Sequence, residues 1–140
     1  MRIVTILAAL SLSFTATAAD HPLAGTWKLV SVHTEVVATG EKIGGCGAKS
    51  EGLMSIQPDG KSFTVMVPED PKMPLNANAS THRLTGESQT TIHRELAAAP
   101  SPDQVRNFKI DGRDLYMSTV PTTGADGRET RAVIHLMRLR

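Results

Sequence analysis

The sequence predicts an all-β protein, an eight-stranded antiparallel up-and-down barrel that follows an N-terminal signal helix. Three observations support this fold class. Turn signals built from glycine, proline and aspartate recur along the chain, short runs rich in valine, isoleucine and threonine separate them, and several runs alternate apolar with polar residues. A closed barrel is favoured over a sandwich because closure removes the exposed edges of the sheet.

The N-terminus has the pattern of a cleaved signal peptide. Arg2 precedes an apolar stretch that runs from Ile3 to Leu12, and small residues follow up to Ala19. The stretch is shorter than the roughly 20 residues that span a bilayer. We therefore expect cleavage near Ala19, no membrane insertion, and a single exported domain over residues 20–140 that is secreted or periplasmic.

Eight segments of this domain combine strand-forming residues with flanking turns. They are residues 25–34, 53–57, 62–67, 81–85, 88–96, 105–110, 114–120 and 129–140. In the third segment Phe63, Val65 and Val67 alternate with polar positions and are predicted to face the interior. Residues 102–105, with Ser101 as a cap, are the one predicted helical turn of the domain, and residues 44–47 are interpreted as a rim loop.

Charge and cysteine content limit the partners. The chain carries 15 Lys and Arg and 14 Asp and Glu, and its net charge of +1 falls to zero with the loss of Arg2. A neutral domain lacks the positive charge that attracts nucleic acid, so no nucleic-acid partner is expected. The single cysteine, Cys46, cannot form an internal disulfide, which leaves an inert thiol or a dimer through Cys46.

Six motifs follow one another along the domain. The first is "LAGTWKLVSV" at residues 23–32, with Gly25 and Trp27 spaced as GxW. It is followed by "GLMSIQPDG" at 52–60, "TTIHREL" at 90–96, "PSPDQV" at 100–105, "VRNFKIDGRDLYMSTV" at 105–120 and "IHLMRLR" at 134–140. In this order the motifs resemble the bacterial lipocalin-like domain family. The resemblance implies a lipocalin-type barrel in which Trp27, after Gly25, closes one end. It also implies that Arg138, from the last strand, covers the indole.

The strand pattern also gives candidate ligand-binding residues. One face of each strand would line a cavity if the barrel is not filled by its own side chains. The candidates are Met54, Ile56, Phe63, Val65, Phe108, Ile110, Leu115 and Met117. Such a lining suits a small apolar or amphipathic molecule, bound without catalysis and without a cofactor or metal.

Two other functions remain open at this point. A small-barrel enzyme, such as a cyclase, isomerase or dehydratase, could use His93 with a carboxylate such as Glu95 or Asp114 as an acid–base pair. Alternatively, a filled barrel could act as a protein-interaction module through an exposed apolar patch. His82 and His93 share a face if Gly86 lies in a two-residue turn and lie on opposite faces after a three-residue turn.

Overall fold

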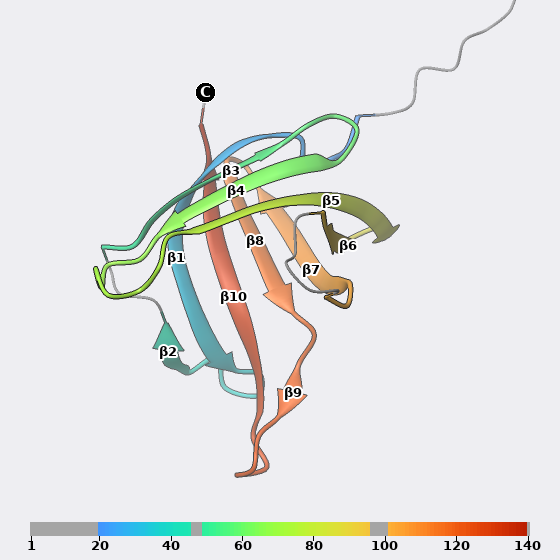
Figure 1. Ribbon diagram of the computed structural model, residues 1–140. Coiled ribbons are helices and arrows are strands. Elements are labelled where there is room, and N and C mark those ends of the chain that lie inside the picture. The colour runs from blue at the N-terminus through green and yellow to red at the C-terminus, as the bar shows by residue number, and fades with distance from the viewer. Residues whose placement is uncertain (1–19, 46–48, 96–100, 140) are drawn as a thin grey trace, which may run out of the picture.

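The computed structural model describes residues 20–45, 49–95 and 101–139, and it shows a closed antiparallel up-and-down β-barrel of eight strands (Figure 1). This confirms the predicted fold class. The described residues contain no helix, and therefore none long and apolar enough to cross a membrane. The predicted signal peptide and Cys46 lie outside the described residues.

The barrel strands follow one another around the wall in chain order. They are β1 (Gly25–Val36), β3 (Glu51–Ile56), β4 (Lys61–Val67), β5 (Asn76–Gly86), β6 (Gln89–Arg94), β7 (Gln104–Asp111), β8 (Asp114–Thr119) and β10 (Glu129–Arg138). Pairing of β10 with β1 closes the ring. Two short strands, β2 (Lys42–Gly45) and β9 (Thr122–Thr123), extend the sheet beside β1 and β10.

The wall is longer on one side than on the other. β1 and β10 pair from Trp27 opposite Arg138 to Val36 opposite Thr130, whereas β3 pairs with β1 only as far as Lys28. Beyond that point β1 pairs with β2 instead. The long ends of β1 and β10 therefore project from the barrel away from Trp27, as Figure 1 shows.

The two walls of the interior differ in polarity. The apolar core comes from β1, β3, β8, β10 and the segment before β1: Leu23, Trp27, Leu29, Met54, Ile56, Leu115, Met117 and Leu136. The wall of β4, β5 and β6 instead buries Ser62, Ser80, His82 and Thr90. Its hydroxyls are partly satisfied locally, since Ser62 donates to the carbonyl of Ser80 at 3.2 Å.

The predicted inward face of β4 is wrong. Phe63 is 52% exposed, while Ser62 is buried. Met54 and Ile56 of β3 face the core and pair with Thr64 and Ser62, so these β4 positions point inward and Phe63 points outward. Because side chains alternate along a strand, a hydrophobic pattern read one residue out of phase reverses every position.

Two local predictions are also corrected. Residues 102–105 do not form a helical turn, because Gln104 and Val105 begin β7 and pair with Ile92 and Thr91. Gly45 does not belong to a rim loop but ends β2, where a Cβ atom would lie 2.4 Å from the carbonyl oxygen of Val32. Glycine is needed there because the two backbones approach too closely for a side chain.

Candidate functional site

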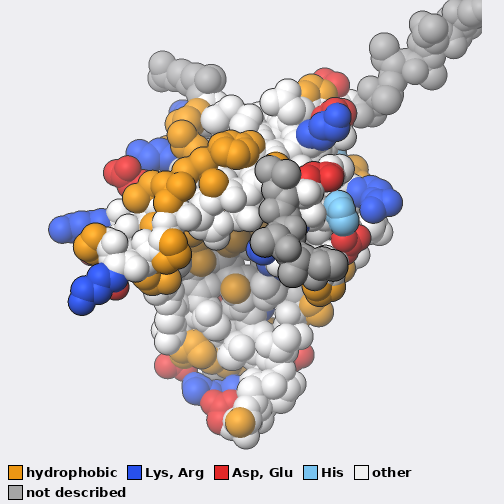
Figure 2. All heavy atoms as spheres, viewed as in Figure 1, with side chains coloured by type: hydrophobic (Ala, Val, Ile, Leu, Met, Phe, Trp, Pro, Cys, Tyr) orange, Lys and Arg blue, Asp and Glu red, His pale blue; other side chains and the backbone are white. Residues whose placement is uncertain are grey.

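A cavity of about 210 Å³ lies inside the barrel. All eight barrel strands contribute to its lining, whereas the buried Trp27 and Leu115 do not. The apolar core around Trp27 therefore closes the barrel at one end, and the cavity occupies the part beyond it. The space-filling view shows the surface hollowed below the strands that cross the front of the barrel (Figure 2).

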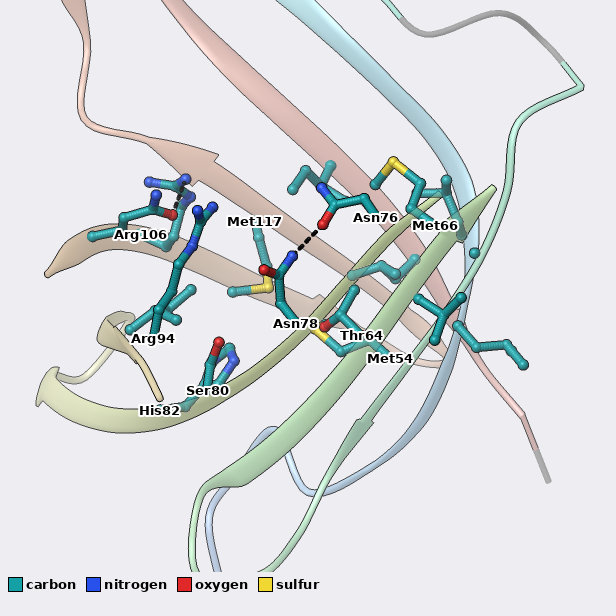
Figure 3. A pocket seen from close by; sticks show the side chains of 18 residues that line it. Met54, Thr64, Met66, Asn76, Asn78, Ser80, His82, Arg94, Arg106 and Met117 are labelled. Atoms are coloured by element: carbon teal, nitrogen blue, oxygen red, sulfur yellow. Dashed lines mark hydrogen bonds between the residues drawn. The ribbon is translucent and has the colours of Figure 1, made fainter. Parts of the chain in front are cut away.

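One wall of the cavity is apolar and rich in methionine. Met54 and Met117 face it from β3 and β8, Met66 from β4, and Leu136 and Ile134 from β10 (Figure 3). Methionine is unbranched and polarizable, so it adapts to ligands of different shape better than branched side chains do. This wall can take the hydrocarbon part of a small molecule.

The lining along β5, which pairs with β4 and sets Asn76 beside Met66, is polar and uncharged. Asn76 and Asn78 are joined by a hydrogen bond between their amide groups, and Ser80 and His82 follow on the same face (Figure 3). Burial, with a smaller contribution from His21, lowers the pKa of His82 from 6.5 to about 4. His82 is therefore neutral at pH 7, and its Nδ1 has no hydrogen-bond partner within the described part of the chain.

Two arginines lie together at one side of the cavity. Arg94 and Arg106 both line it, and Figure 3 shows their guanidinium groups side by side. Arg106 donates to the side-chain oxygen of Gln104 at 2.9 Å and to the carbonyl of Val105 at 3.1 Å. Partial burial, with the charge of Arg94, lowers the pKa of Arg106. Positive charge is thus concentrated beside an otherwise uncharged lining.

The predicted ligand-binding residues fall into three groups. Met54, Val65 and Met117 line the cavity. Ile56, Leu115 and Phe108 belong to the core or pack against it without lining this cavity. Phe63 and Ile110 are exposed, at 52% and 38%, and Phe63 faces away from the interior. Ligand binding by any of them stays a prediction.

The residues expected to close the barrel lie together. The Trp27 side chain is fully buried and donates from Nε1 to the carbonyl of Leu23 at 2.9 Å. The guanidinium of Arg138 lies 4.3 Å from the centre of the indole ring and donates to the carbonyl of Ala24 at 3.0 Å. At Gly25, with φ of +141°, a Cβ atom would lie 2.8 Å from the Arg138 side chain, so glycine leaves the space that the arginine occupies.

The histidines are distributed over both faces of the wall. A bulge between Leu84 and Gly86 sets His82 opposite Ile92, which places His82 and His93 on opposite faces. His93 is exposed and pairs with Asp103 at 2.7 Å, not with Glu95, which accepts a hydrogen bond from Thr81. No group of three metal-binding side chains occurs in the ranges that the structure describes.

The positions of the histidines and carboxylates can be compared with the acid–base pair that the small-barrel enzyme alternative requires. The carboxylate of Asp114 is hydrogen-bonded to His135 at 2.7 Å on the outer face. His82 is the one histidine of the cavity lining, and none of the described lining residues is acidic. The described lining therefore contains no histidine–carboxylate pair.

Several residues of the site are missing from the sequence-based set: Arg94, Arg106, Asn76, Asn78 and His82. Alternation along the strands could have placed the two arginines on the inner face. Arg94 is two residues from Ile92, and Arg106 is two residues from Phe108, so each arginine shares a face with an apolar residue. Asn76 and Asn78 belong to a stretch without a strand signal. They become part of β5 through pairing with β4.

Comparison with known proteins gives no family assignment. No family model, no curated protein and no solved structure matches this chain.

Proposed function

We propose that this protein is an exported lipocalin-like barrel that binds or sequesters a small apolar or amphipathic molecule without catalysing a reaction. The observation that carries the proposal is the cavity of about 210 Å³ inside the barrel. It exceeds the roughly 150 Å³ of an apolar protein cavity that takes up benzene. Its size suits a molecule with a short hydrocarbon part and not a large flat cofactor.

The chemistry of the lining supports binding more than a structural role. The lining combines an apolar part with a few polar groups, which is the composition typical of small-molecule sites. The methionines of one wall are suited to fit different ligands, and the amides and hydroxyls of the other wall can orient a polar group. Export and the lipocalin-like assignment are supported by the signal-like N-terminus and the GxW motif.

A pair of substitutions at neighbouring positions tests this function. Met66 lines the cavity, whereas Val67 is 46% exposed. Met66→Trp should fill the cavity and lower ligand affinity at least tenfold, and Val67→Trp should leave it within twofold. The protein would be purified from its own host, its ligand identified as an added mass in native mass spectrometry, and rebinding measured by calorimetry. Repeated ligand-free spectra, together with no binding across a panel of lipids and metabolites, would contradict the proposal.

A second candidate function is favoured by the outer surface of β3 and β4. Leu53, Phe63 and Val67 are about half exposed there, and hydrophobic side chains gather over this region in Figure 2. Exposed apolar patches can mark interaction sites. Under this alternative, Phe63→Ser should abolish association with a partner or a second copy, measured by light scattering, and leave small-molecule binding unchanged. Unaltered association would exclude the patch.

A further inference from the structure

The two arginines of the cavity are directed inward by the pairing of their strands. Arg94 is opposite Ser80, and Arg106 is opposite Thr90, and both partners are buried interior residues. Residues opposite each other in antiparallel strands share a face. Both guanidinium groups therefore belong to the cavity side of the wall, where Figure 3 shows them close together.

The charge of this pair is not neutralised within the described residues. Neither arginine takes part in the ion pairs found there, and the nearest acidic residues in sequence are engaged elsewhere, Asp103 with His93 and Glu95 with Thr81. The residues that connect β6 to β7 and are not described, 96–100, are Leu, three Ala and Pro, and hold no carboxylate. Two adjacent positive charges repel each other, and the repulsion is relieved when an anion binds between them.

Arg106 is also held in place before any ligand arrives. Gln104 and the carbonyl of Val105 accept hydrogen bonds from its two terminal nitrogens. A guanidinium that is already fixed loses little further entropy when it forms a two-pronged contact with a carboxylate. Its partial burial strengthens that contact, because the surroundings screen charge less than water does.

Apolar side chains of the cavity lining lie next to the arginine pair. Met117 lies between the arginine pair and the far side of the cavity in Figure 3, and Met54 lines the same volume. A ligand that satisfies both regions has a negative group at one end and a hydrocarbon chain of limited length at the other.

We propose that the ligand is a small amphipathic carboxylate, with its carboxylate between Arg94 and Arg106 and its chain against Met54 and Met117. The inference rests on the proposed small-molecule binding and specifies the chemical class of the ligand. Neutral molecules of the same shape would bind more weakly, and cationic ones more weakly still.

Three probes with the same eight-carbon chain test it by calorimetry on the purified protein: octanoate, 1-octanol and octylamine. Octanoate should bind at least tenfold more tightly than 1-octanol, and octylamine should be the weakest. Arg106→Gln should weaken octanoate binding at least tenfold and Arg94→Gln severalfold, while the affinity for 1-octanol stays within twofold. Arg83→Gln provides the matched control, since Arg83 is exposed on β5 and absent from the cavity lining.

The outcomes separate this inference from the function on which it rests. Equal affinities for octanoate and 1-octanol, or an unchanged octanoate affinity in Arg106→Gln, would overturn the carboxylate site and leave small-molecule binding standing. Absence of binding by all three probes would likewise overturn the carboxylate site, and native mass spectrometry with the wider ligand panel would test small-molecule binding separately. Circular dichroism spectra and melting temperatures of the variants would establish that each loss arises in a folded protein.

Discussion

The two ends of the barrel both contain arginine but use it differently. At the closed end Arg138 lies over the Trp27 ring and donates to the Ala24 carbonyl. In the cavity Arg94 and Arg106 lie beside each other, without an acidic partner among the described residues. The comparison separates an arginine whose interactions are completed by the fold from a pair whose charge no described side chain neutralises.

The residues near Arg138 and those near the cavity arginines also differ in how fully their polar groups are hydrogen-bonded. The Trp27 indole donates to Leu23, and Leu23 is itself fully buried. The cavity lining, by contrast, includes the buried His82, whose Nδ1 has no hydrogen-bond partner among the described residues. We therefore expect substitutions at the closed end to change stability and substitutions at the cavity to change binding.

Loss of Trp27 should have the largest effect on stability. Removal of this fully buried side chain in Trp27→Ala leaves a cavity and should lower the free energy of unfolding by about 3–5 kcal/mol. Urea denaturation followed by circular dichroism measures it, with Tyr116→Ala, at a 37% exposed position, as the milder control. A variant of wild-type stability that had lost ligand binding would instead make Trp27 a wall of the site.

Protonation of His82, which lines the cavity, should lower the stability of the protein in acid. Because burial lowers its folded pKa to about 4, from 6.5, the unfolded chain binds a proton first as the pH falls. Stability is therefore lost as the pH falls from above 6.5 towards 4, by about 2 kcal/mol between pH 7 and pH 5 for this group. Burial lowers the pKa of His21 as well, which acts in the same direction.

The variant His82→Leu isolates this contribution. Urea denaturation at pH 7 and at pH 5 should show a smaller loss of stability in the variant than in the wild type. Identical losses in the two proteins would show that His82 is not the group responsible.

Arg138 should contribute less to stability than Trp27 does, but more than the cavity arginines do. Arg138→Gln removes the cation–π contact and a charged hydrogen bond to a carbonyl, and should destabilise the barrel by about 1–2 kcal/mol. The expected octanoate affinity is unchanged. Thermal unfolding and calorimetry on the same sample measure both quantities, and a large change in affinity with no change in stability would reverse the roles assigned to the two ends.

The cavity arginines should have the smallest effect on stability. Arg106→Gln removes two hydrogen bonds but also a charge that is repelled by Arg94. Because these effects oppose each other, we expect the free energy of unfolding to change by no more than about 0.5 kcal/mol. Urea denaturation without ligand tests this, with Arg83→Gln as the control. A loss above about 2 kcal/mol would make Arg106 a structural residue.

The barrel could be predicted from the sequence because turns and strand composition are local signals. The Pro-Asp-Gly and Asp-Gly turns and the GxW motif lie where the structure has hairpins and the start of β1. The inward face of β4 could not be predicted in this way, because Phe63 and Val67 belong to a regular alternation of apolar and polar residues and yet are exposed. Pairing with β3, and not the local pattern, decides which face is buried.

The site was less predictable than the fold for a related reason. Hydrophobic residues were used to locate the cavity, whereas seven of its eighteen described lining residues are polar side chains of β5, β6 and β7. Asn76 and Asn78 become strand residues only through pairing with β4. Arg94 and Arg106 stand in different strands, and only the β6–β7 pairing brings their side chains together.

The methionines allow the most direct test of the central claim that the cavity binds a small amphipathic molecule. Met54, Met66 and Met117 line it, whereas Met73 is 60% exposed and Met137 is 37% exposed outside it. In a protein labelled with carbon-13 at the methionine methyl groups, octanoate should shift the NMR signals of the first three in a saturable manner and leave those of Met73 and Met137 in place. Shifts confined to Met73 and Met137, or no saturable shift at any methionine, would contradict the account.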